Sequence, residues 1–113
     1  MSSYRVIEQA EIQVSPTARR LDGHAFAAPV SLFLLDNPPG KGPELHVHPY
    51  AETFVVESGQ ATFTVDGGTI VAQAGDVVVV DPETPHKFIS SGRENLRMVA
   101  VHPVAEIVQT WLE

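Results

Sequence analysis

The stretch ELHVHPYAETFVVESG, residues 44–59, places two histidines and a glutamate directly before an apolar run. Side chains two residues apart on a β-strand point to the same face, so His46 and His48 project in one direction. The Pro-Tyr pair that follows predicts a turn, after which Glu52 starts a second strand. If the two strands pair, Glu52 returns beside the imidazoles. Two imidazoles and a carboxylate on one face suit iron, manganese, nickel or zinc; the alternative is a pair of surface histidines near a loop.

The bulk composition describes an ordinary globular domain with an excess of acidic residues. The chain has 113 residues, of which 43% are hydrophobic and 19% charged, enough for one domain with one core. Its net charge of −7 disfavours nucleic acid and anionic membranes as partners. Cysteine is absent, which excludes disulfides, thiolate zinc sites and cysteine nucleophiles. No secretory signal and no run of about 20 apolar residues is visible, so we expect a cytoplasmic protein.

Short apolar runs separated by turn residues follow one another along the second half of the chain. They are Glu52–Ser58, Ala61–Val65, Thr69–Ala72, Asp76–Val80, Pro85–Ser90 and Leu96–His102. An earlier run, residues 30–35, has the same β-branched and aromatic character. The Asp-Gly-Gly element at residues 66–68 predicts a tight hairpin, because these residues adopt positive φ at little cost. Evenly spaced short strands predict an all-β sandwich or barrel.

The last residues have a different period. Val104, Ile107, Val108, Trp111 and Leu112 recur at helical spacing, and Pro103 suits the first turn of a helix. This pattern predicts a short amphipathic α-helix over about residues 104–112. Such a helix would cap the sheet or dock onto a second subunit.

Two motifs resemble the conserved motifs of the cupin superfamily. The pattern Gly40-x5-His46-x-His48-x3-Glu52-x6-Gly59, residues 40–59, is similar to the first cupin motif at every fixed position. Residues 75–90 are similar to the second motif; they begin with Gly-Asp and include the histidine of the stretch TPHKF. The second motif departs from the usual pattern at three positions, which are Asp81 in place of proline, Glu83 in place of glycine and Ser90 in place of asparagine.

The resemblance implies a single cupin domain over residues 1–113, folded as a jelly-roll β-barrel. It also implies one divalent transition metal inside the barrel. The implied ligands are His46, His48, Glu52 and His86. We expect iron or manganese, while nickel and zinc fit the same donor set.

The pocket beside such a metal is predicted from strand alternation. If Glu52 and His86 point inward, Phe54 and Phe88 do so too, either as pocket lining or as plain core. On the strand over residues 96–102, Met98 shares a face with the final residue, His102. The candidate pocket residues are therefore Tyr50, Phe54, Phe88, Met98 and His102.

Two of the candidate site residues could also move protons. Glu52 and His102 are the acid–base candidates, although His102 can equally be a strand-end residue without a role. Tyr50 follows the ligand strand and either gates the site or packs against it. The sequence identifies no catalytic residue beyond these candidates.

Three functions fit this predicted site. The first is a metal-dependent dioxygenase or related oxidoreductase acting on a small, largely apolar organic substrate, because few arginines or lysines are available for a strongly anionic one. The second is a redox-neutral isomerase, lyase or cyclase that uses the metal as a Lewis acid. The third is a non-catalytic cupin that binds a small molecule. We also expect a homodimer, because exposed sheet edges promote aggregation unless they are covered.

Overall fold

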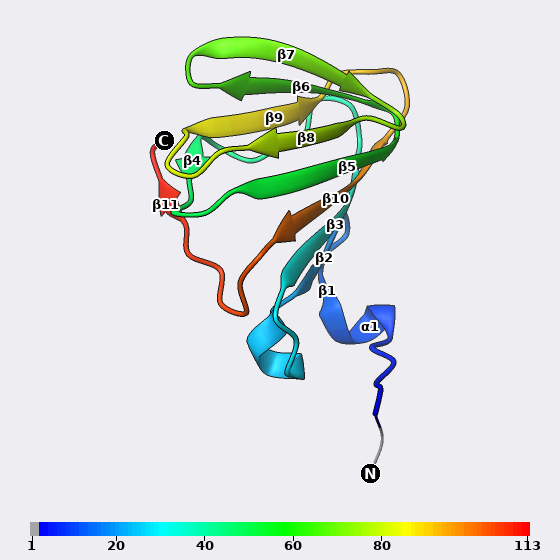
Figure 1. Cartoon of the computed structure of the whole chain (residues 1–113). Coiled ribbons are helices and arrows are strands. Elements are labelled where there is room, and N and C mark those ends of the chain that lie inside the picture. Colours follow the sequence, from blue (N-terminus) through cyan, green and yellow to red (C-terminus); the bar gives the residue numbers. More distant parts are fainter. Residues whose placement is uncertain (1–2) are drawn as a thin grey trace.

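Two antiparallel β-sheets make up the fold in the computed structural model, which describes residues 3–113. Figure 1 shows the second sheet above the first, with α1 at the lower end of the first sheet. In spatial order, the strands of the first sheet are β1 (Gln13–Ser15), β2 (Ala18–Leu21), β3 (Ser31–Asn37), β10 (Leu96–His102), β5 (Glu52–Ser58) and β8 (Val77–Val80).

The second sheet contains the remaining strands. In spatial order they are β11 (Thr110–Trp111), β4 (His46–Val47), β9 (His86–Ser90), β6 (Gln60–Val65) and β7 (Gly68–Gln73). The helices are short, namely α1 (Gln9–Ile12) and the 3₁₀-helix η1 (Gly23–Phe26). Neither helix has the length and apolar character needed to cross a membrane, and no other helix occurs over residues 3–113.

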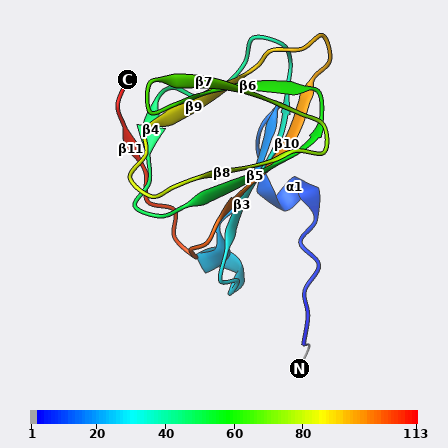
Figure 2. The ribbon, with the colours of Figure 1, turned by 45° about the horizontal axis from the view of Figure 1, so that its top comes forward.

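The hydrophobic core lies between the two sheets, which Figure 2 shows from a second angle. Strand alternation places every second side chain inward, so that Phe54 of β5 pairs across the ladder with Ala100 of β10. Phe54 also contacts Phe63 of β6 edge to face, with ring centroids 5.0 Å apart. The same alternation makes Glu52 and His102 inward-facing, so the polar residues continue the buried face of the core strands.

The hairpin between β6 and β7 confirms the prediction from the Asp-Gly-Gly element. Val65 pairs with Gly68, and both residues of the turn, Asp66 and Gly67, have positive φ. Positive φ at both positions is the geometry of a type I′ turn, whose twist matches that of the strands.

The strands do not close into the predicted barrel. Closure would require β7 and β8, which are consecutive in the chain, to join the two sheets into one ladder. Instead, the turn between them pairs with β5. Val56 N–H donates to the Asp76 carbonyl over 3.0 Å, and Gly75 N–H donates to the Val56 carbonyl over 2.8 Å. The chain therefore passes from one sheet to the other at this turn, and the fold is a β-sandwich.

The C-terminal α-helix predicted over residues 104–112 is wrong. Residues 104–106 form bends, residues 107–109 are irregular, and strand β11 then pairs with β4 through Thr110 opposite Val47 and Trp111 opposite His46. Leu112 N–H also donates to the carbonyl of residue 45 over 2.9 Å. The physical reason is that β4 would otherwise end the second sheet with unpaired backbone groups, and edge pairing satisfies them as an internal helix could not.

Candidate metal centre

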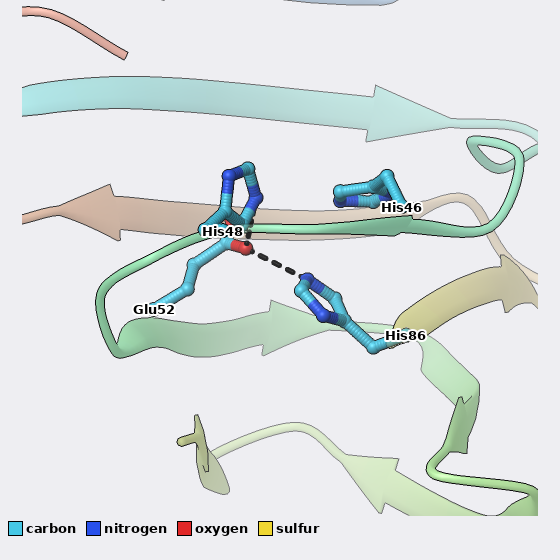
Figure 3. Close-up of side chains that lie close together, drawn as sticks. All are labelled: His46, His48, Glu52 and His86. Carbon is cyan, nitrogen blue, oxygen red and sulfur yellow. Dashed lines mark hydrogen bonds and ion pairs between the residues drawn. The ribbon is translucent and has the colours of Figure 1, made fainter. Parts of the chain in front are cut away.

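Four buried side chains converge at one end of the sandwich. The ligand atoms of His46, His48, Glu52 and His86 all lie within 4.8 Å of one another. Figure 3 shows the imidazoles of His48 and His86 directed at the Glu52 carboxylate, with the His46 ring beside them. His46 belongs to β4, and His86 begins β9 directly opposite it in the ladder. Glu52 begins β5, so the two sheets both contribute to the group.

Backbone carbonyls fix the orientation of the three imidazoles. In each ring, Nδ1 lies 2.8 Å from a carbonyl oxygen, which can only accept a hydrogen bond. Nδ1 therefore carries the proton, and in the neutral ring Nε2 presents its lone pair to the centre of the group. The carbonyls belong to Glu44 for His46, to Val108 for His48, and to Thr84 for His86.

Glu52 occupies the middle of this arrangement. Its Oε1 lies 3.1 Å from Nε2 of His48 and 3.0 Å from Nε2 of His86. Its Oε2 lies 3.0 Å from Nε2 of a further buried histidine, His102. Burial opposes the charge of the carboxylate, but the contacts with these three imidazoles outweigh burial and hold the pKa of Glu52 below its ordinary value. Glu52 is therefore an anion enclosed by nitrogen atoms.

His46 of β4 and His48, which follows that strand, differ in how readily they gain a proton. Burial, reinforced by the neighbouring His86, lowers the pKa of His46. Burial also disfavours the charged form of His48, but the Glu52 carboxylate and the Val108 carbonyl outweigh it and raise the pKa of His48. Nε2 of His48 is buried and makes no hydrogen bond of good geometry, although Oε1 of Glu52 lies 3.1 Å from it.

These observations fit one bound divalent cation. Neutral imidazoles whose Nδ1 atoms are already bonded would turn lone pairs toward a carboxylate, an arrangement that only a proton or a cation between them can stabilise. Three Nε2 atoms and one carboxylate oxygen form a mixed donor set that first-row divalent metals, manganese included, accept. The group is a metal-binding site.

Tyr50 extends the contacts of this site outward. Its hydroxyl lies 2.7 Å from Nδ1 of His102, whose Nε2 contacts Glu52. The backbone N–H of Val108 donates to the same hydroxyl over 3.3 Å. Burial raises the pKa of Tyr50, so the hydroxyl is protonated at neutral pH. Val108 therefore holds two residues of the site, since its carbonyl also accepts the hydrogen bond from His48.

A cavity of about 340 Å³ opens directly on the metal group. Glu52 and His46 line it, together with the predicted pocket residues Phe88 and His102. Phe54 and Met98 are fully buried in the hydrophobic core and are not among its lining residues. Tyr50 is also absent from the lining and lies behind His102.

Several lining residues were missed from the sequence. They come from the N-terminal strands, the loop before β4 and the C-terminal segment, and they include Arg20, Phe33, Asn37, Lys41, Gln109 and Trp111. Lys41 lies inside the first motif but not at one of its fixed positions, the other residues lie outside both motifs, and the C-terminal segment was predicted to be a helix. The inward face of β3 in the apolar run over residues 30–35 was the only signal that could have identified one of them.

The three departures from the second motif have distinct structural consequences. Glu83 adopts positive φ, the conformation for which glycine is usual, and its N–H donates to the His48 carbonyl over 2.8 Å. Ser90 is buried, and its hydroxyl has no hydrogen-bond partner. The asparagine that is usual at this position would place an amide there, which has more donors and acceptors than a hydroxyl. Asp81 is exposed. None of them displaces His86.

Comparison with known proteins places this geometry in a family. The family model described as Cupin domain matches residues 33–102. A structure of oxalate decarboxylase from Bacillus subtilis at pH 4.6 is 29% identical with a TM-score of 0.76; the match covers 89% of this chain and 29% of that one. A structure from work on the Mn(II) centres of the same Bacillus subtilis enzyme is 28% identical with a TM-score of 0.74, covering 87% of this chain and 29% of that one. The chain thus spans somewhat less than a third of the length of these enzymes. None of the curated proteins shows significant sequence similarity to it.

Proposed function

The chain belongs to the cupin domain family, and on that premise we propose that it is a manganese-dependent lyase that decarboxylates a small organic acid without net oxidation. The observation that carries this proposal is the buried His-His-Glu-His group opening on a cavity, in a chain similar to a manganese-containing decarboxylase. This is a redox-neutral function, and it replaces the dioxygenase as the preferred reading of the site.

The residues of the site suit an anionic substrate. Three neutral imidazoles and one carboxylate leave a divalent ion with a net positive charge, which attracts the carboxylate of an acid. A metal held there would act as a Lewis acid on a carboxylate or carbonyl oxygen. Because Phe88 and Ala100 line the cavity beside these residues, the substrate would react in a largely apolar, weakly screened environment.

Decarboxylation also needs a proton. The C–C bond to the carboxylate breaks, CO₂ leaves, and the carbon that remains takes up a proton, so that no electrons are lost overall. Glu52 and His102 are placed to manage this proton, since Oε2 of Glu52 and Nε2 of His102 lie 3.0 Å apart beside the cavity. Tyr50 holds the other nitrogen of His102 and thereby keeps its ring in place.

The test is turnover of the manganese-loaded chain with oxalate and with small 2-oxo acids. We expect CO₂ together with an equal amount of formate from oxalate, or of the corresponding aldehyde from a 2-oxo acid, with no net O₂ consumption. His48→Ala, which removes one ligand, should abolish turnover. Stoichiometric O₂ uptake with an oxidised product would instead support the dioxygenase predicted from the sequence. Tight binding without any product would support a non-catalytic cupin.

A further inference from the structure

The cavity beside the metal group is larger than oxalate requires. A water molecule occupies about 30 Å³ of liquid volume, so a cavity of about 340 Å³ has room for a ligand on the order of ten water volumes. This size lies within the range of roughly 300–1,000 Å³ that is usual for sites that enclose organic ligands. A two-carbon acid would leave most of it filled with water.

The wall of the cavity is mainly apolar away from the metal group. Phe33 and Leu35 of β3 line it, as do Ala100 of β10, Phe88 of β9 and Trp111 of β11. Contact with such a wall contributes about 25 cal/mol for each Å² of apolar surface that a ligand buries. The wall therefore favours a ligand with a hydrocarbon body.

Arg20 of β2 brings a positive charge to the same cavity. Its guanidinium carbon lies 5.3 Å from the centroid of the Phe33 ring, and that ring lies 5.4 Å from the imidazole of His102. Since His102 contacts Glu52, the Phe33 ring separates Arg20 from the metal group. Arg20 can therefore contact a ligand that is bound at the metal group only if that ligand is elongated.

The guanidinium retains donors for such a ligand. Nε and Nη2 both contact one oxygen of Asp22 over 3.0 Å, and the guanidinium makes no other hydrogen bond to the described residues. A guanidinium has five N–H donors in a planar fork that matches a carboxylate. Its side chain is 39% exposed, so a ligand can approach it.

We propose that the acid bound by this site is a dicarboxylate with a short hydrocarbon body. One carboxylate faces the metal group, the body lies against Phe33 and Leu35, and the distal carboxylate binds Arg20. What happens to the first carboxylate rests on the proposed function, but binding of the distal one does not.

Calorimetric binding of two matched six-carbon acids to the manganese-loaded chain tests this inference. Adipate and hexanoate share a hydrocarbon body and differ in the distal carboxylate. A charge-assisted hydrogen bond is worth about a tenfold change in affinity or more, so adipate should bind at least about tenfold more tightly than hexanoate. It should also bind more tightly than oxalate.

Arg20→Gln should reduce the affinity for adipate to that for hexanoate and leave hexanoate unchanged. Arg19→Gln is the matched control, because Arg19 is the neighbouring residue of β2 and is not part of the cavity wall. It should leave both affinities unchanged. Arg20→Lys, which keeps the charge without the fork, should recover part of the difference, and circular dichroism confirms that each variant is folded.

Two results would overturn the inference, namely oxalate binding as tightly as adipate, or Arg20→Gln leaving adipate binding intact. The outcomes for the proposed function are separate. Arg20-dependent binding of adipate without any decarboxylation would remove the proposed function and retain the inference. Oxalate turnover that is insensitive to Arg20→Gln, with no preference for adipate, would do the reverse.

Discussion

At the scale of single residues, Glu52 is shared between two roles. One carboxylate oxygen contacts the imidazoles of His48 and His86, and the other contacts His102. The histidines and the glutamate of the first motif were predictable, because strand alternation and the turn place them on one face. The carbonyl of Val108 that orients His48 was not, because a backbone carbonyl occurs at every residue and leaves no side-chain signal.

His102 should strengthen metal binding through Glu52 without touching the metal. His102→Leu removes the partner of Oε2, and loss of an outer partner typically costs about 10- to 100-fold in metal affinity. His102→Gln retains an amide N–H for Oε2 and should restore most of the affinity. Titration with Mn(II) measures both variants; equal affinities for the leucine variant and the original chain would exclude a positioning role.

The metal-free chain should lose stability in acid through Glu52. The folded state depresses the pKa of this group below its ordinary value of 4.5, so its contribution is present above that pH and declines as the pH falls below it. Thermal unfolding in the presence of chelator, compared between the original chain and Glu52→Gln, measures this contribution. The difference in Tm should be largest near neutral pH and should narrow below about pH 4.5. A difference that widens in acid would contradict this assignment.

At the scale of elements, the C-terminal segment completes the metal site. The apolar spacing of residues 104–112 matched a helix, yet the unpaired edge of β4 and Nδ1 of His48 both take partners from this segment. Helical periodicity is a local signal, whereas the need to pair a distant edge is not visible within a short window. Strands β5, β9 and β10 were predictable because each alternates between more and less buried residues along its own length.

Removing residues 108–113 should weaken metal binding more than it weakens the fold. The deletion removes the carbonyl that holds His48, and we expect metal affinity to fall about 10- to 100-fold. The core between the sheets contains none of these residues, so cooperative unfolding should persist. Val108→Ala is the control, because it keeps the carbonyl and changes a side chain that is half exposed. Equal metal affinities for the deletion and this control would refute the role of the segment.

The bend between β5 and β6 should be more sensitive to substitution than the bend between β7 and β8. Gly59 and Gly75 both have positive φ, which costs a residue with a Cβ about 1–2 kcal/mol. A Cβ at Gly59 would also lie 2.4 Å from the Asn95 carbonyl oxygen, whereas a Cβ at Gly75 would have no neighbouring atom within 4 Å. Gly59→Ala should therefore reduce the free energy of unfolding by more than Gly75→Ala, as chemical denaturation measures. Equal losses would show that the Asn95 backbone yields at little cost.

At the scale of the whole molecule, the sandwich has an apolar part filled by Phe54 and Phe63 and a polar end that holds the metal group. The family and the all-β class were predictable from the two motifs and the evenly spaced turns. The choice between barrel and sandwich was not, because it depends on whether the turn at residues 74–76 pairs with β5 or continues β7. A pocket beside the metal was predicted, but much of its wall was not, since β2, β3 and the C-terminal segment contribute to it.

The homodimer predicted from the sequence stays a prediction at this scale. Val77 and Val79 of β8 are more than half exposed on an edge strand of the first sheet, which is the kind of surface that a second subunit can cover. Sedimentation equilibrium of the chain, together with the double variant Val77→Thr and Val79→Thr, examines it. We expect a dimer that the double variant weakens, and a monomer at all concentrations would rule it out.

The most direct test of the central claim is calorimetric titration of the chelator-treated chain with Mn(II), beside elemental analysis of the purified protein. We expect one divalent metal per chain and a rise in Tm with free metal concentration, because an ion that binds only the folded state stabilises it. The His48→Ala variant should show neither effect. The His24→Ala variant, which replaces an exposed histidine, should show both. Absence of saturable binding, or binding that His48→Ala leaves intact, would contradict the assignment of His46, His48, Glu52 and His86 as one metal site.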